Sequence, residues 1–102
     1  IIGASCYDQL ALAQQAVAVG ASYVSFGAFF PSPSKVTTHR AQPQLLRDAA
    51  TLGVPRVAIG GLTADNTAPL VEAGADLVAV ISGVFATDDP VAALRAYQAS
   101  FA

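Results

Sequence analysis

Two glycine-containing motifs, each placed directly after a short apolar run, are the first candidates for chemistry in this chain. Gly60 and Gly61 follow one such run, and Ser82 and Gly83 follow the next run along the sequence. A glycine turn lets the backbone come close to an anion, and unpaired N–H groups then bind phosphate oxygens. Either motif alone is explained equally well as a tight turn. Two neighbouring turns of the same chemistry favour a phosphate-binding site.

A loop stiffened by two prolines adds hydroxyl groups and a cation. It carries Ser32, Ser34 and Lys35. Hydroxyls donate to phosphate oxygens, and a lysine is a point charge that suits a diphosphate. Ser5 ends another apolar run and is predicted to lie at the same edge, although a serine there is equally suited to capping the next helix. A solvated loop with a chance lysine is the alternative for the proline-rich segment.

The remaining reactive residue types do not form a recognisable site. Cys6 is the single cysteine and has no basic neighbour in sequence, so we expect a small buried side chain and not a nucleophile. His39 is the single histidine, which excludes a histidine pair for a metal. Of the carboxylates, we expect only Asp8 near the edge that carries Ser5, and we predict no metal site within this chain.

The composition excludes several classes of function. Of 102 residues, 54% are hydrophobic and 12% charged, and five scattered Lys and Arg residues give no basic surface for nucleic acid or membrane lipids. The longest apolar run, residues 77–81, is far shorter than the roughly 20 residues that span a bilayer. No secretory signal pattern is present, and we expect a cytoplasmic protein. The absence of Met, including an initiator, suggests an upstream segment.

The elements that must position these residues alternate regularly along the chain. Short apolar runs at 1–5, 22–27, 54–59 and 76–81 predict buried strands. Helical periodicity predicts helices at 7–19, 42–52 and 65–73, which end at Gly20, Gly53 and Gly74. Thr63 or Asp65 is expected to cap the third helix. The last helix is expected to start at Pro90 after an Asp89 cap, with four residues facing inward: Val91, Leu94, Tyr97 and Phe101.

Four consecutive βα units predict a parallel sheet with right-handed crossovers. Two architectures fit them: a small open doubly wound sheet, and half of a (β/α)8 TIM barrel, whose site lies on the loops after the strands. A faint repeat, in which residues 19–24 resemble residues 73–78, fits duplicated βα units. The missing Met and a strand at the first residue favour the half barrel.

Three motifs in order resemble the C-terminal half of the thiamine phosphate synthase family, strands 5 to 8 of its barrel. They are residues 27–35 (Gly-Ala-Phe-Phe-Pro-Ser-Pro-Ser-Lys), 57–66 (Val-Ala-Ile-Gly-Gly-Leu-Thr-Ala-Asp-Asn), and 73–76 with 80–85 (Ala-Gly-Ala-Asp and Val-Ile-Ser-Gly-Val-Phe). The resemblance covers the whole chain, residues 1–102. It implies an enzyme of thiamine biosynthesis, a transferase that joins hydroxymethylpyrimidine diphosphate to thiazole phosphate and releases diphosphate.

The resemblance also implies a role for each candidate residue. Ser32 and Ser34 are similar to the hydroxyl residues that hold the thiazole phosphate. Gly61, Ile81 and Ser82 resemble the backbone cradle of the same phosphate. Lys35 and Ser5 are similar to the residues that contact the pyrimidine diphosphate, and they are the candidate catalytic residues.

The resemblance places Mg²⁺ ligands of the family in the missing N-terminal half, so this fragment alone is expected to be inactive. The expected partners are small phosphorylated substrates, and either the missing half or a second copy of the chain to cover the barrel interior. Two alternatives stay open: a relative that isomerises the thiazole, as a thiazole tautomerase does, and a non-catalytic phosphate-binding module appended to another enzyme. Lys35 favours the synthase, because only the synthase must manage a diphosphate.

Overall fold

The computed structural model describes residues 1–30, 40–80 and 88–101. Its four strands are β1 (Gly3–Ser5), β2 (Tyr23–Phe26), β3 (Arg56–Ile59) and β4 (Leu77–Ala79). The α-helices are α1 (Leu10–Ala18), α2 (Pro43–Asp48), α3 (Ala68–Ala73) and α5 (Pro90–Gln98), and two short 3₁₀ helices are η1 (Ala49–Leu52) and η2 (Ala99–Phe101). The predicted order of βα units is confirmed, although most elements are shorter than the sequence patterns suggested.

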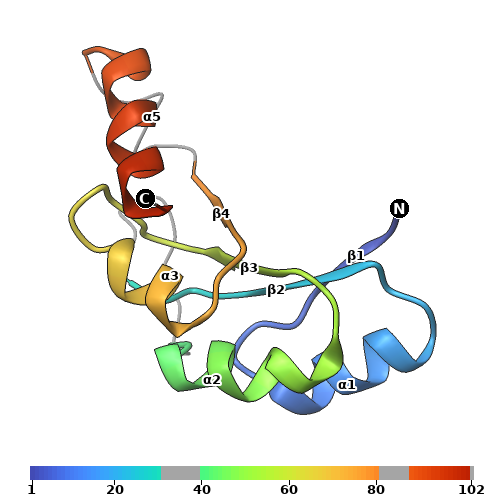
Figure 1. The fold of residues 1–102 in the computed structure, drawn as a ribbon. Helices are drawn as coiled ribbons and strands as arrows, with labels where there is room; N and C mark the ends of the chain where they lie inside the picture. The colour runs from blue at the N-terminus through green and yellow to red at the C-terminus, as the bar shows by residue number, and fades with distance from the viewer. Residues whose placement is uncertain (31–39, 81–87, 102) are drawn as a thin grey trace.

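The four strands form one parallel sheet in the order β1-β2-β3-β4. In Figure 1, α1 and α2 run along one face of this sheet and α5 stands upright at one end. The order follows from the βα connections, since each helix returns the chain to the same end of the sheet. Both β1 and β4 are edge strands of this sheet, so their outer hydrogen-bonding groups have no strand partner among the described residues.

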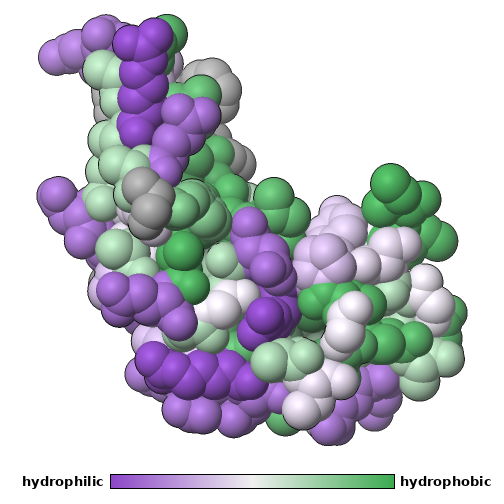
Figure 2. All heavy atoms as spheres, in the orientation of Figure 1, coloured by the Kyte–Doolittle hydropathy of each residue, from purple (hydrophilic) through white to green (hydrophobic). Residues whose placement is uncertain are grey.

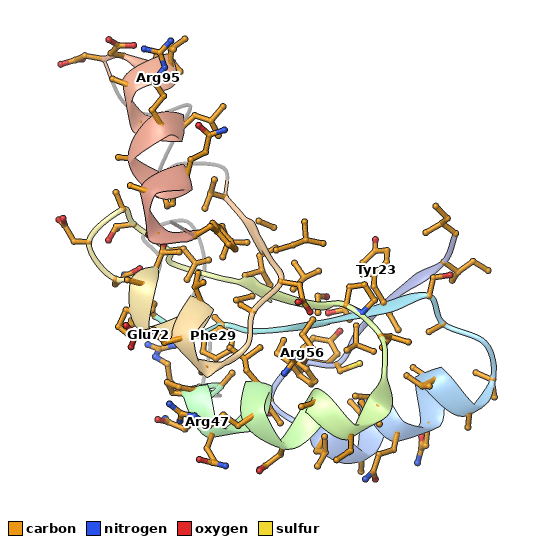
Figure 3. All side chains as sticks on the ribbon, in the orientation of Figure 1. Tyr23, Phe29, Arg47, Arg56, Glu72 and Arg95 are labelled. Carbon is orange, nitrogen blue, oxygen red and sulfur yellow. The ribbon has the colours of Figure 1, made fainter. Side chains whose placement is uncertain are left out.

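The core lies between the sheet and the helices. Val24 and Phe26 of β2 point to the helical side, and they are fully buried together with Leu46 of α2 and Leu70 of α3. Alternate residues of a strand face opposite sides, so Tyr23 and Ser25 face the other way. In Figure 3, Tyr23 lies on the side of the sheet away from α1 and α2.

The opposite face of the sheet is open, which corrects the prediction of strands buried on both faces. Ile59 is 39% exposed and Leu77 is 52% exposed, and both are large apolar residues on strands. Register places Leu77 beside Val57, and Val57 beside Ser25, on one face. Figure 2 shows a hollow beside the column of α5, with hydrophobic side chains exposed around it. A parallel βα sheet normally has both faces covered.

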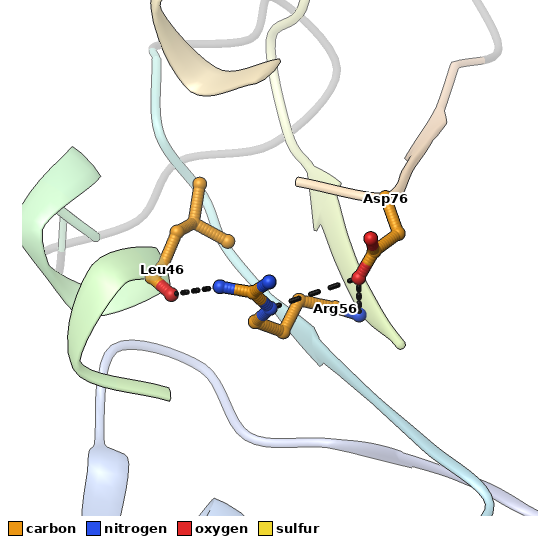
Figure 4. Close-up of polar contacts among 3 residues, drawn as sticks. All are labelled: Leu46, Arg56 and Asp76. Carbon is orange, nitrogen blue, oxygen red and sulfur yellow. Dashed lines mark hydrogen bonds and ion pairs between the residues drawn. The ribbon is translucent and has the colours of Figure 1, made fainter. Parts of the chain in front are cut away.

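Arg56 fastens β3 to its neighbours on the helical side. Its Nη1 donates to the carbonyl oxygen of Leu46 at 2.8 Å, and its backbone N–H donates to Asp76 Oδ2 at 2.9 Å. The Nε atom lies 3.6 Å from the same carboxylate oxygen, an ion pair without a good hydrogen bond. Figure 4 shows Arg56 between α2 and the start of β4. The contacts of Arg56 connect α2, β3 and the start of β4, none of which carries a candidate catalytic residue.

The last helix differs from its prediction in the residues that it buries. Asp89 does cap it, since Asp89 Oδ1 accepts from the N–H of Ala92 at 3.1 Å. Tyr97 is buried as expected, but the other three residues predicted to face inward are exposed: Val91, Leu94 and Phe101. For Val91 and Leu94 the reason is visible in Figure 1, where α5 stands away from the sheet for most of its length. Phe101 lies beyond α5, in η2, which contacts α3.

Candidate phosphate site at the carboxyl edge of the sheet

The carboxyl ends of all four strands meet at one edge, because the sheet is wholly parallel. Ser5 ends β1, Gly27 follows β2, and Gly60 and Gly61 follow β3. In open α/β sheets and in βα barrels, ligands bind at this edge. The described candidates from three different βα units therefore lie at the same end of the molecule.

The loops after β2 and β3 are in direct contact. The N–H of Phe30 donates to the carbonyl oxygen of Gly60 at 3.1 Å. A Cβ atom at Gly60 would lie 2.5 Å from the Cβ of Ala28, so this close approach requires glycine. On the far side of residues 31–39, the N–H of Ala41 donates to the carbonyl oxygen of Ala28 at 2.9 Å. Both ends of the segment that carries the serines and the lysine are thus anchored beside the glycine turn.

The glycine turn itself has a conformation that other residues rarely adopt. Gly60 and Gly61 have φ angles of 99° and 70°, which explains why two glycines occur in succession. Within the described residues, neither the N–H of Gly61 nor that of Leu62 donates to a protein acceptor. Free, closely spaced N–H groups are what an anion cradle provides.

Helix α3 starts later than predicted, which changes the backbone conformation next to Gly61. Helix α3 begins at Ala68 with Thr67 as its N-cap, and no side-chain cap is formed. The expected cap by Thr63 or Asp65 is therefore wrong. Residues 64–66 form turns instead, held by the Asn66 and Thr67 side chains. Any anion at Gly61 consequently meets the amides of the loop and not the first turn of a helix.

Ser5 lies where a ligand on the open face could reach it. It is exposed, and register pairs it with Ser25 on β2. It is not a helix cap, because α1 begins at Leu10 after Gln9 and has no side-chain cap. Ser25 brings a second hydroxyl to the same face and was not among the predicted residues. The alternation of residues 23–26 could have identified it, since a period of two puts Ser25 opposite the apolar pair.

Cys6 is a buried thiol, and the predicted burial is confirmed. It is 1% exposed, and its Sγ lies 3.5 Å from the carbonyl oxygen of Ala4. Burial raises the pKa of Cys6 above its ordinary value, because the thiolate would lose its hydration. A raised pKa reduces the nucleophilic thiolate. Tyr97 is the second group with a raised pKa, again because burial disfavours the charged form.

The loops that follow the strands carry four described carboxylates: Asp8, Asp65, Asp88 and Asp89. Asp8 follows β1 as expected, and Asp65 belongs to the loop after β3, contrary to the prediction that it lies away from the edge. Within residues 1–30, 40–80 and 88–101, no group of three or more His, Cys, Asp and Glu side chains is arranged to hold a metal ion.

Several predicted residues lie outside the described part of the chain. They are Ser32, Ser34, Lys35, His39, Ile81 and Ser82. Their roles remain predictions from the sequence. Two residues that the sequence patterns did not single out for the site, Asn66 and Tyr97, contact the glycine loop directly.

The geometry defines a class of protein: parallel βα proteins with a glycine turn at the carboxyl edge of the sheet. A sequence profile of the thiamine monophosphate synthase family matches residues 1–84. The chain belongs to this family, and the resemblance inferred from its motifs is confirmed.

Individual relatives agree with this family. A thiamine-phosphate synthase of Xanthomonas campestris pv. campestris strain 8004 is 62% identical over 101 residues, which cover 99% of this chain and 49% of the relative. The corresponding protein of Xylella fastidiosa strain Temecula1 is 60% identical and is covered to 43%. The chain spans about half the length of these curated relatives, and it corresponds to their C-terminal half.

Solved structures confirm the fold. The thiamine phosphate pyrophosphorylase of Pyrococcus furiosus superposes with a TM-score of 0.83 at 33% identity, over 99% of this chain and 48% of that protein. A geranylgeranylglyceryl phosphate synthase of Thermoplasma acidophilum superposes with a TM-score of 0.74 at 24% identity, over 90% of this chain and 36% of that protein, which shows the fold alone. The four βα units are thus half of a TIM-barrel type fold.

Proposed function

We propose that this chain supplies the thiazole phosphate site of a thiamine phosphate synthase, an enzyme that joins hydroxymethylpyrimidine diphosphate to thiazole phosphate. The observation that carries the proposal is the contact between the two loops: the N–H of Phe30 donates to Gly60, at the point where the Ser/Lys segment begins. The relatives support the activity, since the proteins of Xanthomonas and Xylella are both called thiamine-phosphate synthase.

In this proposal, the chain binds two phosphorylated substrates on neighbouring loops. The N–H groups at Gly61, Ile81 and Ser82, together with the hydroxyls of Ser32 and Ser34, hold the thiazole phosphate. Lys35 and Ser5 contact the diphosphate of the pyrimidine substrate. As the bond to that diphosphate breaks, negative charge builds on the leaving group, and the Lys35 ammonium stabilises it.

The proposal includes a magnesium ion, which is bound by residues outside this chain. Among the described residues, no group of three or more His, Cys, Asp and Glu side chains is arranged for a metal ion, and we propose that its ligands belong to an N-terminal half of the protein. The residues of this chain bind and orient the substrates and offset charge on the leaving diphosphate.

We also propose that the open face of the sheet is an internal surface of the complete protein. Ile59 and Leu77 are exposed on this face, and β1 and β4 each leave one edge unpaired within the described sheet. Open edges and exposed apolar faces favour association. The partner is the N-terminal half or, failing that, a second copy of this chain. None of the described helices is long and apolar enough to cross a membrane; a cytoplasmic location remains part of the proposal.

The phosphate cradle is tested by Gly61→Val in the full-length protein. Gly61 has a φ of 70° in the cradle, and Gly53 has a φ of 74° at the opposite edge of the sheet, where an added Cβ would meet no atom within 4 Å. Gly53→Val is therefore a control with the same backbone strain. We expect Gly61→Val to abolish binding of thiazole phosphate in calorimetry, while Gly53→Val retains it.

Equal affinity in the two variants would overturn the cradle assignment. Retained binding of thiazole phosphate by the unaltered protein, without condensation when both substrates and Mg²⁺ are supplied, would instead support the binding-module alternative. Mass spectrometry of the product distinguishes condensation from isomerisation of the thiazole alone.

A further inference from the structure

Asn66 closes the loop after β3 with both ends of its amide. Its Nδ2 donates to the carbonyl oxygen of Gly61 at 3.2 Å, and its Oδ1 accepts from the backbone N–H of Thr63 at 2.8 Å. Thr67 adds a third contact, since its Oγ1 donates to the carbonyl oxygen of Thr63 at 2.6 Å. An amide offers a donor and an acceptor side by side, which neither a carboxylate nor a hydroxyl does at this spacing.

Tyr97 reaches the same loop from α5, 35 residues further along the chain. Its hydroxyl donates to the carbonyl oxygen of Leu62 at 2.8 Å. Tyr97 is 3% exposed and Leu62 is 5% exposed, so water cannot readily replace this bond if it is lost. A buried carbonyl without a partner is costly, so the hydroxyl strongly constrains the peptide that it holds.

These contacts are linked in series, and the last of them orients the N–H of Leu62. In a trans peptide, the C=O of one residue and the N–H of the next point in opposite directions. Tyr97 holds the Leu62 C=O, which directs the N–H of Thr63 onto Asn66. Asn66 in turn holds the Gly61 C=O, which directs the N–H of Leu62 to the opposite side.

The neighbouring N–H of the cradle is fixed in the same way by the other loop. The Gly60 C=O accepts from the N–H of Phe30 at 3.1 Å, so the N–H of Gly61 points away from that contact. Neither the Gly61 nor the Leu62 N–H has an acceptor among the described residues. Each N–H is therefore aimed by a hydrogen bond on its preceding carbonyl.

We propose that Asn66 and Tyr97 are positioning residues of the phosphate cradle: neither touches the phosphate, and together they aim the Leu62 N–H at it. This inference rests on the proposed phosphate site at Gly61. It assigns a functional role to the last helix of the chain, which otherwise makes few contacts with the sheet.

The test uses the full-length protein labelled with ¹⁵N and titrated with inorganic phosphate, with the amide signals of Gly61 and Leu62 as the readout. The variants are Tyr97→Phe, which removes one hydroxyl from a buried ring, and Asn66→Ala. Leu46→Val is the control, because Leu46 is fully buried in α2 away from this edge. It lowers stability without touching the loop.

We expect Tyr97→Phe to weaken phosphate binding about three- to tenfold, the size of one neutral hydrogen bond, and Asn66→Ala to weaken it at least as much. The KM for thiazole phosphate should rise in parallel, with the KM for the pyrimidine diphosphate unchanged. The Leu62 amide signal should shift in both variants before phosphate is added. Leu46→Val should leave affinity and both signals unchanged.

Three results would overturn the inference: unchanged phosphate affinity in Tyr97→Phe and Asn66→Ala, an equal loss in Leu46→Val, or no response of the Gly61 and Leu62 amides to phosphate in the unaltered protein. Failure of the proposed enzyme activity is a separate result. The amides would then respond to phosphate, and the variants would weaken that response, without any condensation of the two substrates.

Discussion

Lys35 and Gly61 are proposed to serve different substrates, so their substitutions should have different kinetic signatures. Lys35→Ala removes one charge-assisted contact to a diphosphate, which is worth about 1.5–3 kcal/mol, or about ten- to a hundredfold in affinity. In the full-length protein we expect this loss for the pyrimidine diphosphate, with thiazole phosphate binding little changed. Calorimetry with each substrate separately measures both. Equal losses for the two substrates would mean that Lys35 only shapes its loop.

Tyr97 should make the stability of the protein sensitive to alkaline pH. Burial raises the pKa of Tyr97 above its usual value of about 10, so the folded state holds the phenol proton more tightly than the unfolded state. Its contribution to the free energy of unfolding is complete below about pH 10 and is lost as pH rises through the folded pKa. Urea titrations between about pH 8 and 11 should show a steeper loss than in Tyr97→Phe. Parallel curves for the two proteins would contradict this expectation.

Helices α1 and α3 are both followed by a glycine with a positive φ angle, but the surroundings of the two glycines differ. Gly20 follows α1 with a φ of 105°, and Gly74 follows α3 with a φ of 118°. A Cβ at Gly20 would meet nothing within 4 Å, whereas a Cβ at Gly74 would lie 2.5 Å from Arg56 Nη1. Only the second glycine makes room for the arginine that joins α2, β3 and β4.

We therefore expect Gly74→Ala to destabilise the protein more than Gly20→Ala. Both substitutions force a left-handed backbone on a residue with a Cβ, at a cost of roughly 1 kcal/mol. Gly74→Ala also displaces the Arg56 guanidinium from Leu46, adding about 1–3 kcal/mol. Chemical unfolding of the two variants measures the difference. In an Arg56→Met background the additional cost should disappear. If it persists there, the clash with Arg56 is not its cause.

The whole molecule is half of a TIM-barrel type fold. Its core lies on one side of the sheet, and the other side is an open apolar face. We expect the 102-residue chain alone to associate through this face. Leu77→Glu places a charge on that face, where Leu77 is 52% exposed, and should reduce association in sedimentation velocity experiments. Val91→Glu, on the exposed side of α5, is a control for added charge. Equal behaviour of the two variants would argue against the sheet face as the contact.

The same incompleteness predicts that these 102 residues alone do not make thiamine phosphate. The proposed reaction needs a metal held near the leaving diphosphate, and the described residues hold no group of three or more His, Cys, Asp and Glu side chains arranged for a metal ion. The purified chain, supplied with both substrates and Mg²⁺, should give no product by mass spectrometry. Turnover comparable to that of a full-length relative would refute this and direct attention to Asp8 and its neighbours.

The order of the elements and the family could both be predicted from the amino-acid sequence. Apolar runs, helical periodicity and the glycines at the helix ends are local signals, so the four βα units and the Asp89 cap were predictable. The ordered motifs around Ser32, Lys35 and Gly61 identified the family for the same reason, because each motif is a continuous run of residues.

The support of the candidate site, by contrast, became visible only in three dimensions. The bond from Tyr97 to Leu62 joins residues 35 positions apart, and no periodicity in a sequence encodes such a partner. Helix α3 starts late, and the side chains of Asn66 and Thr67 donate to carbonyl oxygens of the preceding loop. Such side-chain hydrogen bonds compete with helix formation, and helix propensity alone does not predict which of the two prevails. The exposure of Val91 likewise reflects which surfaces meet in space: an amphipathic pattern shows that a face is apolar, and only packing shows what covers it.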